Sequence, residues 1–241
     1  MSGSPIPTLI VVSGPAGSGK TTLAHEIARA VGCPAICRDE IKEGMAHASP
    51  GFTPAAGDEL TMRTLPVFFG LLEQLLLAGA TTVADAAFQD KVWRPFLTPL
   101  LPLARPRIVQ CAADPEVAFG RITRRRAQYP PRGAHADPDA ADREDYLRRM
   151  RAFDRISLDV PQLAVDTTDG YRPSLEEIVA FAGGRGALAR GLARRPPRVE
   201  ERRSGGCRQP RRMRRMRTGP AGRRVTNPRG RGNPGPTRSS R

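Results

Sequence analysis

The sequence has few of the residues that build metal and disulfide sites. Four cysteines and three histidines occur in 241 residues, and no two cysteines form a C-x-x-C pair. The histidines are too few to complete a zinc set, so Cys33 and Cys37 are interpreted as small buried apolar residues. The first apolar run, Leu9 to Val12, has no Lys or Arg before it and is too short for a signal peptide or a membrane span. We therefore expect a cytoplasmic protein with no membrane partner.

Aromatic residues and lysine are missing from the end of the chain. No aromatic residue follows Phe181, and no lysine follows Lys91. The net charge of +15 is concentrated there, because residues 1–184 carry 20 basic and 22 acidic side chains whereas residues 185–241 carry 19 and 2. A segment dominated by Arg, Gly, Pro and Ser cannot bury enough surface to offset its ordering entropy. We predict one domain over residues 1–184 and a disordered basic tail over residues 185–241.

The charge of this tail would attract polyanions without specificity and with a steep dependence on salt. It has no aromatic side chains on which bases could stack, which argues against sequence-specific binding of single strands. Two alternatives stay open: a solvated tail, and a coding-frame extension without a selected role. Because residues 1–184 are slightly acidic, the high charge of the whole chain does not argue for a nucleic-acid substrate of the domain.

Short apolar segments alternate with helical patterns over residues 8–181. We predict five strands, at residues 8–13, 35–37, 81–84, 107–111 and 163–165. We predict helices over residues 22–31, 39–46, 58–78, 91–104, 114–128, 140–156 and 174–181. Pro66 should start or kink its helix, and Ser174 with Glu177 should form a capping box. This alternation predicts an α/β protein, a three-layer α/β/α sandwich with a five-stranded parallel sheet, which binds ligands at the carboxyl ends of its strands.

A glycine-rich motif follows the first predicted strand and precedes a predicted helix. Residues 14–21 read G-P-A-G-S-G-K-T and match G-x-x-x-x-G-K-[ST], the P-loop or Walker A motif. Lys20 would place its charge on the β- and γ-phosphates of ATP, and the Thr21 hydroxyl would ligate Mg²⁺. The glycines let the backbone curl so that its N–H groups point at phosphate oxygens. The residues predicted to bind ATP are Gly14, Pro15, Ala16, Gly17, Ser18, Gly19, Lys20, Thr21 and Thr22, of which Pro15 and Ala16 are fillers.

Two aspartates follow the second and third predicted strands. Asp39 would lie at the carboxyl edge of the sheet beside the γ-phosphate, where a kinase places its general base. Asp39 is equally suited to be the N-cap of the next helix, and spacing does not separate these roles. Lys42 lies one turn further along the same helical face. Asp85 would orient a Mg²⁺-bound water or the acceptor; the alternative is a turn residue at a strand end.

A basic cluster precedes a loop rich in Pro and Gly. Arg121 and Arg125 share one helical face, as the arginines of a lid that closes over ATP would. The alternative is a solvated basic face, and this is our interpretation of Arg124 and Arg126. His135 lies in the loop, where we expect it to be exposed.

Together these motifs resemble the polynucleotide-kinase-like group of P-loop kinases, often labelled AAA-type ATP-binding proteins, with zeta toxins and chloramphenicol phosphotransferases as relatives. The resemblance covers residues 8–182. It depends on the loop at residues 14–22, on the pair Arg38-Asp39, on Asp85-Ala86-Ala87 and on an R-x-x-x-R pattern at residues 121–125.

The resemblance implies that Asp39 is the general base and that Lys42 and Arg38 help to hold the acceptor. It also implies that Arg121 lies near the adenine and Arg125 near the phosphates. Lys42 replaces an Arg of the polynucleotide kinases, and no phosphatase domain follows. We expect the acceptor pocket to be built from residues 58–69 and 86–93, without a motif that identifies the acceptor.

The expected function is therefore transfer of the ATP γ-phosphate, with Mg²⁺, to an unidentified hydroxyl acceptor, either a small molecule or a nucleic acid 5′-hydroxyl. The catalytic residues would be Lys20, Asp39 and Arg125, with Asp85 on the acceptor side. The alternative is an ATP-hydrolysing switch or ATP-binding module in which water is the acceptor. That alternative requires a residue that orients water, and the sequence shows no evident candidate.

Overall fold

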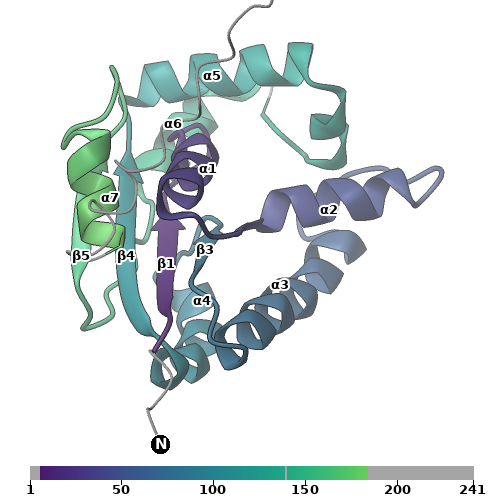
Figure 1. Cartoon of the computed structure of the whole chain (residues 1–241). Coiled ribbons are helices and arrows are strands. Elements are labelled where there is room, and N and C mark those ends of the chain that lie inside the picture. The colour runs from purple at the N-terminus through teal and green to yellow at the C-terminus, as the bar shows by residue number, and fades with distance from the viewer. Residues whose placement is uncertain (1–5, 139, 184–241) are drawn as a thin grey trace, which may run out of the picture. The chain divides into compact units, whose positions relative to one another are not determined.

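Five parallel strands form one sheet in the computed structural model, which describes residues 6–138 and 140–183. The strands are β1 (Thr8–Ser13), β2 (Ala35–Cys37), β3 (Thr82–Asp85), β4 (Arg105–Ala112) and β5 (Gln162–Asp166). Their order across the sheet is β2-β3-β1-β4-β5, with β1 in the centre (Figure 1). Every neighbouring pair is parallel. The predicted five-stranded parallel sheet is thus confirmed, and β1 and β2 have the predicted bounds.

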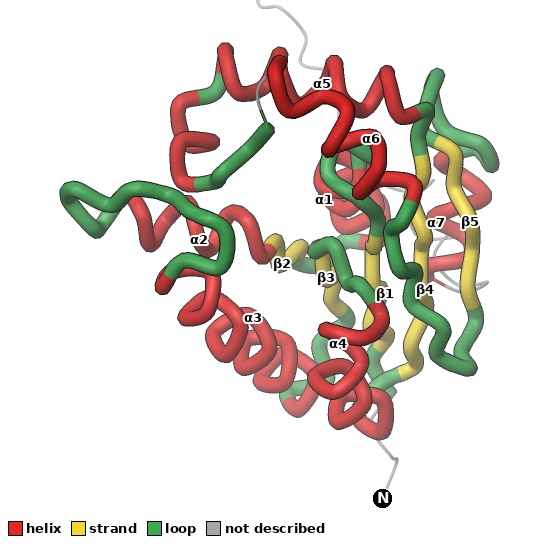
Figure 2. The backbone as a smooth tube through the Cα atoms, turned by 180° about the vertical axis from the view of Figure 1, so that it is seen from behind, coloured by secondary structure: helices red, strands yellow, loops and turns green. Residues whose placement is uncertain are grey.

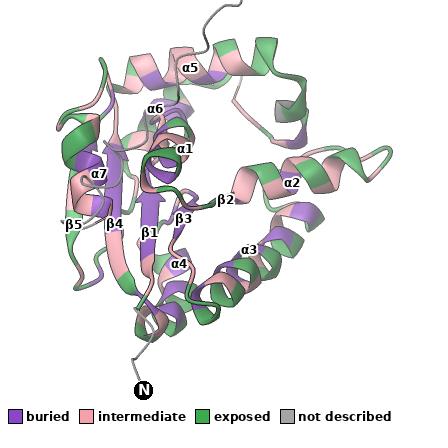
Figure 3. Cartoon of the chain, viewed as in Figure 1, coloured by how far each residue is buried: buried purple, intermediate pink, exposed green. Residues whose placement is uncertain are grey.

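Helices cover both faces of this sheet, as Figures 1 and 2 show from opposite sides. The helices are α1 (Lys20–Val31), α2 (Arg38–His47), α3 (Glu59–Leu77), α4 (Asp90–Leu97), α5 (Pro115–Gln128), α6 (Arg143–Arg151) and α7 (Leu175–Gly183). Short 3-10 helices are η1 (Thr98–Leu103), η2 (Pro130–Ala134) and η3 (Ala140–Asp142). Ile10 and Val12 of β1 pack with α1 and α7, whereas Leu9 and Val11 pack with α3 and α4. Because successive strand side chains alternate between faces, β1 is buried on both sides (Figure 3) and the predicted sandwich is confirmed.

The layer of α3 and α4 contains an aromatic cluster. The ring centroids of Phe68 and Phe88 lie 5.9 Å apart, and those of Phe88 and Trp93 lie 5.0 Å apart. All three side chains are buried. These rings belong to the segments that we expected to build the acceptor pocket. The structure places them in the core instead, because the sheet face beneath α3 needs large apolar side chains to cover it.

Helix α3 is long and apolar enough to cross a membrane by length and composition, and it is the one such helix in the part of the chain that the structure describes. Its residues Phe68, Leu72 and Leu76 are buried at helical spacing in the core cluster with Leu9 and Val11 of β1. The packed face therefore accounts for much of its apolar composition. Helix α3 begins at Glu59 and continues through Pro66, so Pro66 does not start the helix; a kink there stays a prediction.

Two predicted helices are shorter than expected. The helix predicted over residues 140–156 is observed as α6, which ends at Arg151 because the chain must leave the helix for Ile156 and Leu158 to enter the core beside α3 and α4. The helix predicted over residues 91–104 ends as α4 at Leu97 and continues as the Pro-rich 3-10 helix η1, since proline lacks the N–H group that an α-helix requires.

The predicted capping box of the last helix is confirmed. The Ser174 backbone N–H donates to the Glu177 carboxylate at 2.9 Å, and the Glu177 N–H donates to the Ser174 hydroxyl at 3.3 Å. The predicted tail, residues 185–241, lies outside the described residues. Its disorder and its binding of polyanions stay predictions.

Candidate active site

The glycine-rich loop links the end of β1 to the start of α1 at the carboxyl edge of the sheet. Gly17 and Gly19 have φ values of 77° and 75°, in the left-handed region that favours glycine. A Cβ atom at Gly17 would also lie 2.4 Å from the carbonyl oxygen of Ala118, so the loop passes too close to α5 for any side chain there. Gly19 precedes α1 and gives its first turn no capping side chain, which leaves backbone N–H groups to bind an anion.

Side chains from distant segments hold this loop in place. The Tyr146 hydroxyl of α6 donates to the carbonyl oxygen of Ala16 at 2.8 Å, and the Thr167 hydroxyl donates to the carbonyl oxygen of Ser18 at 2.7 Å. Burial raises the pKa of Tyr146 to about 12, so this phenol keeps its proton as a donor near neutral pH. The phosphate-binding loop is thus held in shape by hydrogen bonds from α6 and from the segment after β5.

A cavity of about 240 Å³ brings the predicted catalytic residues together. It lies where the glycine-rich loop, α1, α2 and the end of α5 meet. Its lining residues are Gly17, Gly19, Lys20, Thr21, Thr22, Asp39, Glu40, Glu43, Arg125 and Tyr129. Lys20, Asp39 and Arg125, which are far apart in sequence, therefore line one space.

Asp85 lies behind Lys20 and Thr21 at the end of β3, and only 2% of it is exposed. Burial raises its pKa, while the charge of Lys20 and the hydrogen bond with Thr21 oppose that rise. Among the described residues, its Oδ1 atom has no hydrogen-bond partner. A buried carboxylate with an unsatisfied oxygen, next to the hydroxyl of Thr21, is the hard oxygen donor set that Mg²⁺ prefers. The residues present fit a magnesium ion.

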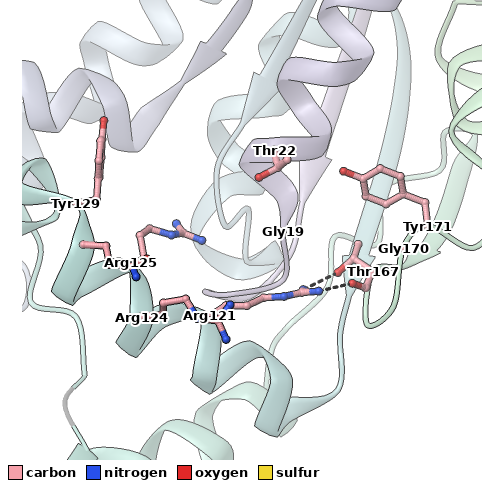
Figure 4. A pocket seen from close by; sticks show the side chains of 10 residues that line it. Gly19, Thr22, Arg121, Arg124, Arg125, Tyr129, Thr167, Gly170 and Tyr171 are labelled. Atoms are coloured by element: carbon pink, nitrogen blue, oxygen red, sulfur yellow. Dashed lines mark hydrogen bonds between the residues drawn. The ribbon is translucent and has the colours of Figure 1, made fainter.

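A second cavity, of about 580 Å³, opens between α5 and the segment after β5 (Figure 4). It shares Gly19, Thr22, Arg125 and Tyr129 with the phosphate cavity. The Arg121 guanidinium is held across its floor, because it donates to the carbonyl oxygens of Thr167 at 2.6 Å and Thr168 at 3.1 Å. A planar guanidinium fixed in this way is suited to contact the flat face of a base. Its place near an adenine stays a prediction.

Tyr129 and Tyr171 stand on opposite sides of this second cavity in Figure 4, with Thr22 of α1 between them. The Tyr171 hydroxyl bonds to Glu26, and burial, with smaller contributions that include this bond, raises the pKa of Tyr171 to about 12. The cavity therefore has aromatic walls on two sides and arginines along α5. A nucleoside that enters here would leave its phosphates at the glycine-rich loop.

A family model described as an AAA domain matches residues 9–153. The chain belongs to this AAA domain family. Its fold is similar to that of a candidate kinase from Chloroflexus aurantiacus J-10-fl, with 24% sequence identity, a TM-score of 0.64, and coverage of 73% of this chain and 97% of that one. At this identity the likeness concerns the fold.

Two further solved structures are similar to this AAA domain. A sugar kinase from Janibacter sp. HTCC2649 has 20% identity and a TM-score of 0.51, over 73% of this chain and 94% of that one. Kti12 from Chaetomium thermophilum, solved with ADP-AlF3, has 16% identity and a TM-score of 0.51, over 74% of this chain and 100% of that one. Among curated proteins, no sequence matches the chain. The P-loop kinase fold is thus shared, while the relatives' own substrates say nothing direct about this AAA domain.

Both cations that the sequence places on the acceptor side of the AAA domain make internal contacts. Arg38 donates to the Asp39 carboxylate at 3.2 Å and to the Thr61 carbonyl oxygen at 3.4 Å. The Lys42 ammonium lies 2.7 Å from the Asp58 carboxylate, and these side chains are only 3% and 7% exposed. Burial raises the pKa of Asp58, but hydrogen bonds from Lys42 and from two backbone N–H groups outweigh it and lower that pKa below its usual range. This geometry gives no support to an acceptor contact by Lys42.

The expectation that His135 is exposed is wrong. Its Nε2 atom lies 3.1 Å from the Glu43 carboxylate, and the two side chains are 9% and 11% exposed. The reason is that η2, directly after α5, folds back onto α2 and buries the histidine between them. The lid segment, by which we mean η2 and His135, is thus held against α2.

A third cavity, of about 640 Å³, lies between α2 and this lid segment. It shares Glu40, Glu43 and Tyr129 with the phosphate cavity, so the two spaces adjoin. Its lining residues are Glu40, Glu43, Gly44, Ala46, His47, Phe52, Tyr129, Pro130, Pro131, Gly133 and Ala134. Sequence reasoning missed this cavity, because its walls come from two distant loops and one helix without a recognisable motif.

A second cluster that sequence reasoning missed joins α1 to the start of α2. The His25 Nε2 atom lies 2.7 Å from the Glu40 carboxylate and 3.5 Å from the Cys37 sulfur. These three donor atoms lie within 4.8 Å of one another. Burial raises the pKa of the Cys37 thiol well above its usual range, which opposes the thiolate that a metal requires. The contacts therefore serve to fix the first turn of α2 beside the phosphate cavity.

Proposed function

We propose that this AAA domain is an ATP-dependent phosphotransferase that moves the γ-phosphate of ATP to a hydroxyl acceptor. The observation that carries the proposal is that Lys20, Asp39 and Arg125 line one cavity beside the glycine-rich loop. A cavity that combines phosphate-binding backbone, two cations and a carboxylate placed to act as base has the parts that phosphoryl transfer needs.

ATP would bind with its base over Arg121 and its phosphates in the loop. The ammonium of Lys20 and the guanidinium of Arg125 would stabilise the negative charge on the transferred group. Mg²⁺, held by the Thr21 hydroxyl with Asp85 close behind, would supply further charge neutralisation on the phosphates. The contact with Arg38 holds the Asp39 carboxylate beside this space.

In the reaction, the acceptor oxygen would attack the γ-phosphorus as the bond from that phosphorus to the bridging oxygen of ADP breaks. The bonding electrons leave with ADP, and the proton of the acceptor hydroxyl passes to the Asp39 carboxylate. A phosphorylated acceptor and ADP are the products. Asp39 would return its proton to solvent before the next turnover.

Substitution Asp39→Asn tests this assignment. We expect transfer of labelled phosphate to fall by about 10²-fold or more, with ATP affinity nearly unchanged, because the amide keeps the shape but cannot take a proton. Asp159→Asn is the matched control, since Asp159 is exposed and away from the cavity. Full turnover in Asp39→Asn would show that the base is assigned wrongly.

The same assay separates the alternative function, an ATP-hydrolysing switch in which water is the acceptor. A phosphotransferase should release ADP faster when a suitable hydroxyl acceptor is added. A switch should release ADP at one rate with and without any acceptor, and the label should appear as free phosphate only.

A further inference from the structure

Thr167, the first residue after β5, joins the phosphate-binding loop to the sheet. Only 3% of this residue is exposed. Its backbone N–H donates to the Ala112 carbonyl oxygen of β4 at 2.8 Å. Its hydroxyl donates to the Ser18 carbonyl oxygen of the loop at 2.7 Å. The Ala112 oxygen lies further from this hydroxyl, at 3.2 Å, so the single hydroxyl proton serves Ser18.

Arg121 holds Thr167 from α5. In Figure 4 its guanidinium reaches across to Thr167, where it donates to the carbonyl oxygen at 2.6 Å and to the hydroxyl oxygen at 3.3 Å. A hydroxyl that accepts from a cation becomes a better donor, because successive hydrogen bonds polarise one another. The charge of Arg121 therefore strengthens the bond from Thr167 to Ser18. The Nη1 atom of Arg121 also lies 3.5 Å from the Gly17 carbonyl oxygen, at the limit of a hydrogen bond.

The two loop glycines with positive φ pack on the same contacts. A Cβ atom at Gly19 would lie 3.4 Å from the Thr167 hydroxyl oxygen and 3.7 Å from a guanidinium nitrogen of Arg121. Gly17 makes its close approach at Ala118, one turn before Arg121 on α5. Because glycine has no side chain to separate them, the loop backbone packs directly on Thr167 and on α5.

The peptide bond converts these contacts into the direction of an N–H group. In a trans peptide such as Ser18-Gly19, the C=O of the first residue and the N–H of the second point in opposite directions. Because Thr167 holds the Ser18 carbonyl oxygen, the Gly19 N–H points away from Thr167. Gly19 lines the phosphate cavity, so this N–H is a backbone donor for an anion there.

We propose that Arg121 is a positioning residue for the phosphate-binding loop and that it acts through the Thr167 hydroxyl. This role is separate from a contact of Arg121 with the base of ATP. Affinity for phosphate groups then depends on Arg121 even when no base is present. The inference rests on the proposed binding of ATP phosphates by the loop, and it does not depend on the identity of the acceptor.

Tripolyphosphate carries phosphates without a base and therefore separates these two roles. Its affinity is measured with the full chain and Mg²⁺ at physiological salt, as displacement of a fluorescent ATP analogue whose own affinity is determined for each variant. The basic tail would attract tripolyphosphate by charge. That contribution is the same in every variant, so differences between variants report on the loop.

Three substitutions test the contact between Arg121 and Thr167. Arg121→Lys keeps the positive charge but loses the planar guanidinium that reaches both oxygens of Thr167. Thr167→Val removes the hydroxyl at nearly constant shape, whereas Thr167→Ser keeps it and should bind close to the parent chain. We expect Arg121→Lys and Thr167→Val each to weaken tripolyphosphate binding by about threefold to tenfold, the effect of one hydrogen bond. The double variant should bind no more weakly than the weaker single variant, because both remove the same contact.

Thr123→Val and Arg126→Lys are the matched controls on α5. The Thr123 hydroxyl donates to backbone carbonyl oxygens one turn earlier in α5, and Arg126 donates to the Asp137 carbonyl oxygen. These contacts do not involve the phosphate-binding loop, so both controls should keep the parent affinity for tripolyphosphate. The free energy of unfolding is measured for every variant. A loss of stability in Arg121→Lys with unchanged tripolyphosphate affinity would show that its role is structural only.

Unchanged tripolyphosphate affinity in Arg121→Lys, with weaker binding of the ATP analogue, would show that Arg121 acts on the base alone and would overturn the inference. Unchanged tripolyphosphate affinity in Thr167→Val, losses that multiply in the double variant, or no binding of tripolyphosphate by the parent chain would overturn it as well. These results leave the phosphotransferase proposal in place, since transfer is assayed separately with labelled ATP. The expected losses, combined with no transfer to any acceptor, would support the inference and overturn the phosphotransferase proposal.

Discussion

The nucleotide side and the proposed acceptor side of this AAA domain differ in how far backbone atoms or side chains form them. The phosphate-binding part of the nucleotide side consists mainly of backbone: the loop with Gly17 and Gly19 at positive φ and the first turn of α1. The acceptor side consists of side chains from α2 and the lid, such as Glu40, Glu43 and Tyr129. A site formed by backbone atoms accepts few residue types, whereas a site formed by side chains can change its ligand through single substitutions.

The two sides also differ in where their charges point. Lys20 and Arg125 face the space for phosphates, while Lys42 is turned into a buried pair with Asp58. The same residue type is thus proposed to bind ligand on one side, whereas on the other side it forms an internal ion pair. Substitutions that separate these two roles are the most direct way to challenge the comparison.

Removal of the Lys20 ammonium should have the largest effect. We expect Lys20→Ala to lower phosphate transfer by about 10³-fold, because the charge on the transferred phosphoryl group loses a preorganised partner. The same change removes the charge that opposes the raised pKa of Asp85, so that pKa should rise further. The rate is measured with labelled ATP, and exposed Lys91→Ala is the control. Normal transfer in Lys20→Ala would remove the functional distinction between the two sides.

Asp58→Asn tests the opposite role on the acceptor side. The substitution leaves the Lys42 ammonium buried without a counter-charge, while asparagine can still cap α3 at the Thr61 N–H. We expect a loss of about 3 kcal/mol in the free energy of unfolding, measured by urea denaturation. Glu59→Gln, which breaks an exposed pair with Arg63, is the neighbouring control and should cost less than about 1 kcal/mol.

The stability difference between the parent chain and Asp58→Asn should depend on pH. Because the folded pKa of Asp58 is lowered, its contribution is present above the unfolded pKa and is lost as the pH falls through the folded pKa. The difference should thus be constant near neutrality and shrink below about pH 4. A difference that grows on acidification would mean that the pair does not stabilise the fold.

Local pattern explains why most of the nucleotide side could be predicted. The motif at residues 14–21 specifies both the backbone curl and the helix that follows it, so Lys20 and Thr21 are placed by their neighbours in sequence. Arg121 and Arg125 share a face of α5 because of helical periodicity alone. The five strands are short apolar segments with β-branched residues, so they could likewise be predicted from local sequence, and the sheet was predicted from them.

The acceptor side could not be predicted in the same way. Lys42 and Asp58 are 16 residues apart, and Glu43 and His135 are 92 residues apart, so no local pattern pairs them. The tertiary contact of η2 with α2 decides that His135 is buried. Helix α6 also ends earlier than predicted because of tertiary packing. Ile156 packs in the core, although the local periodicity of its segment predicts a helix.

The smallest expected effect comes from the Tyr146 hydroxyl, which holds the phosphate-binding loop from α6. Tyr146→Phe removes the bond to the Ala16 carbonyl oxygen but keeps the ring, whose centroid lies 5.3 Å from that of Phe119. We expect the free energy of unfolding to fall by about 1 kcal/mol, because the Ala16 carbonyl oxygen is left without its donor. Part of this loss should appear as weaker ATP binding, measured by calorimetry, since the loop is less well preorganised.

Phe119→Leu is the matched control, because it weakens the packing of Tyr146 and leaves the hydroxyl bond intact. It should lower the free energy of unfolding more than it lowers ATP affinity, whereas Tyr146→Phe should lower both to a similar degree. Unchanged ATP affinity in Tyr146→Phe would mean that the loop keeps its shape without α6. The loop would then depend for its preorganisation on its own glycines and on the Thr167 hydroxyl, without a contribution from α6.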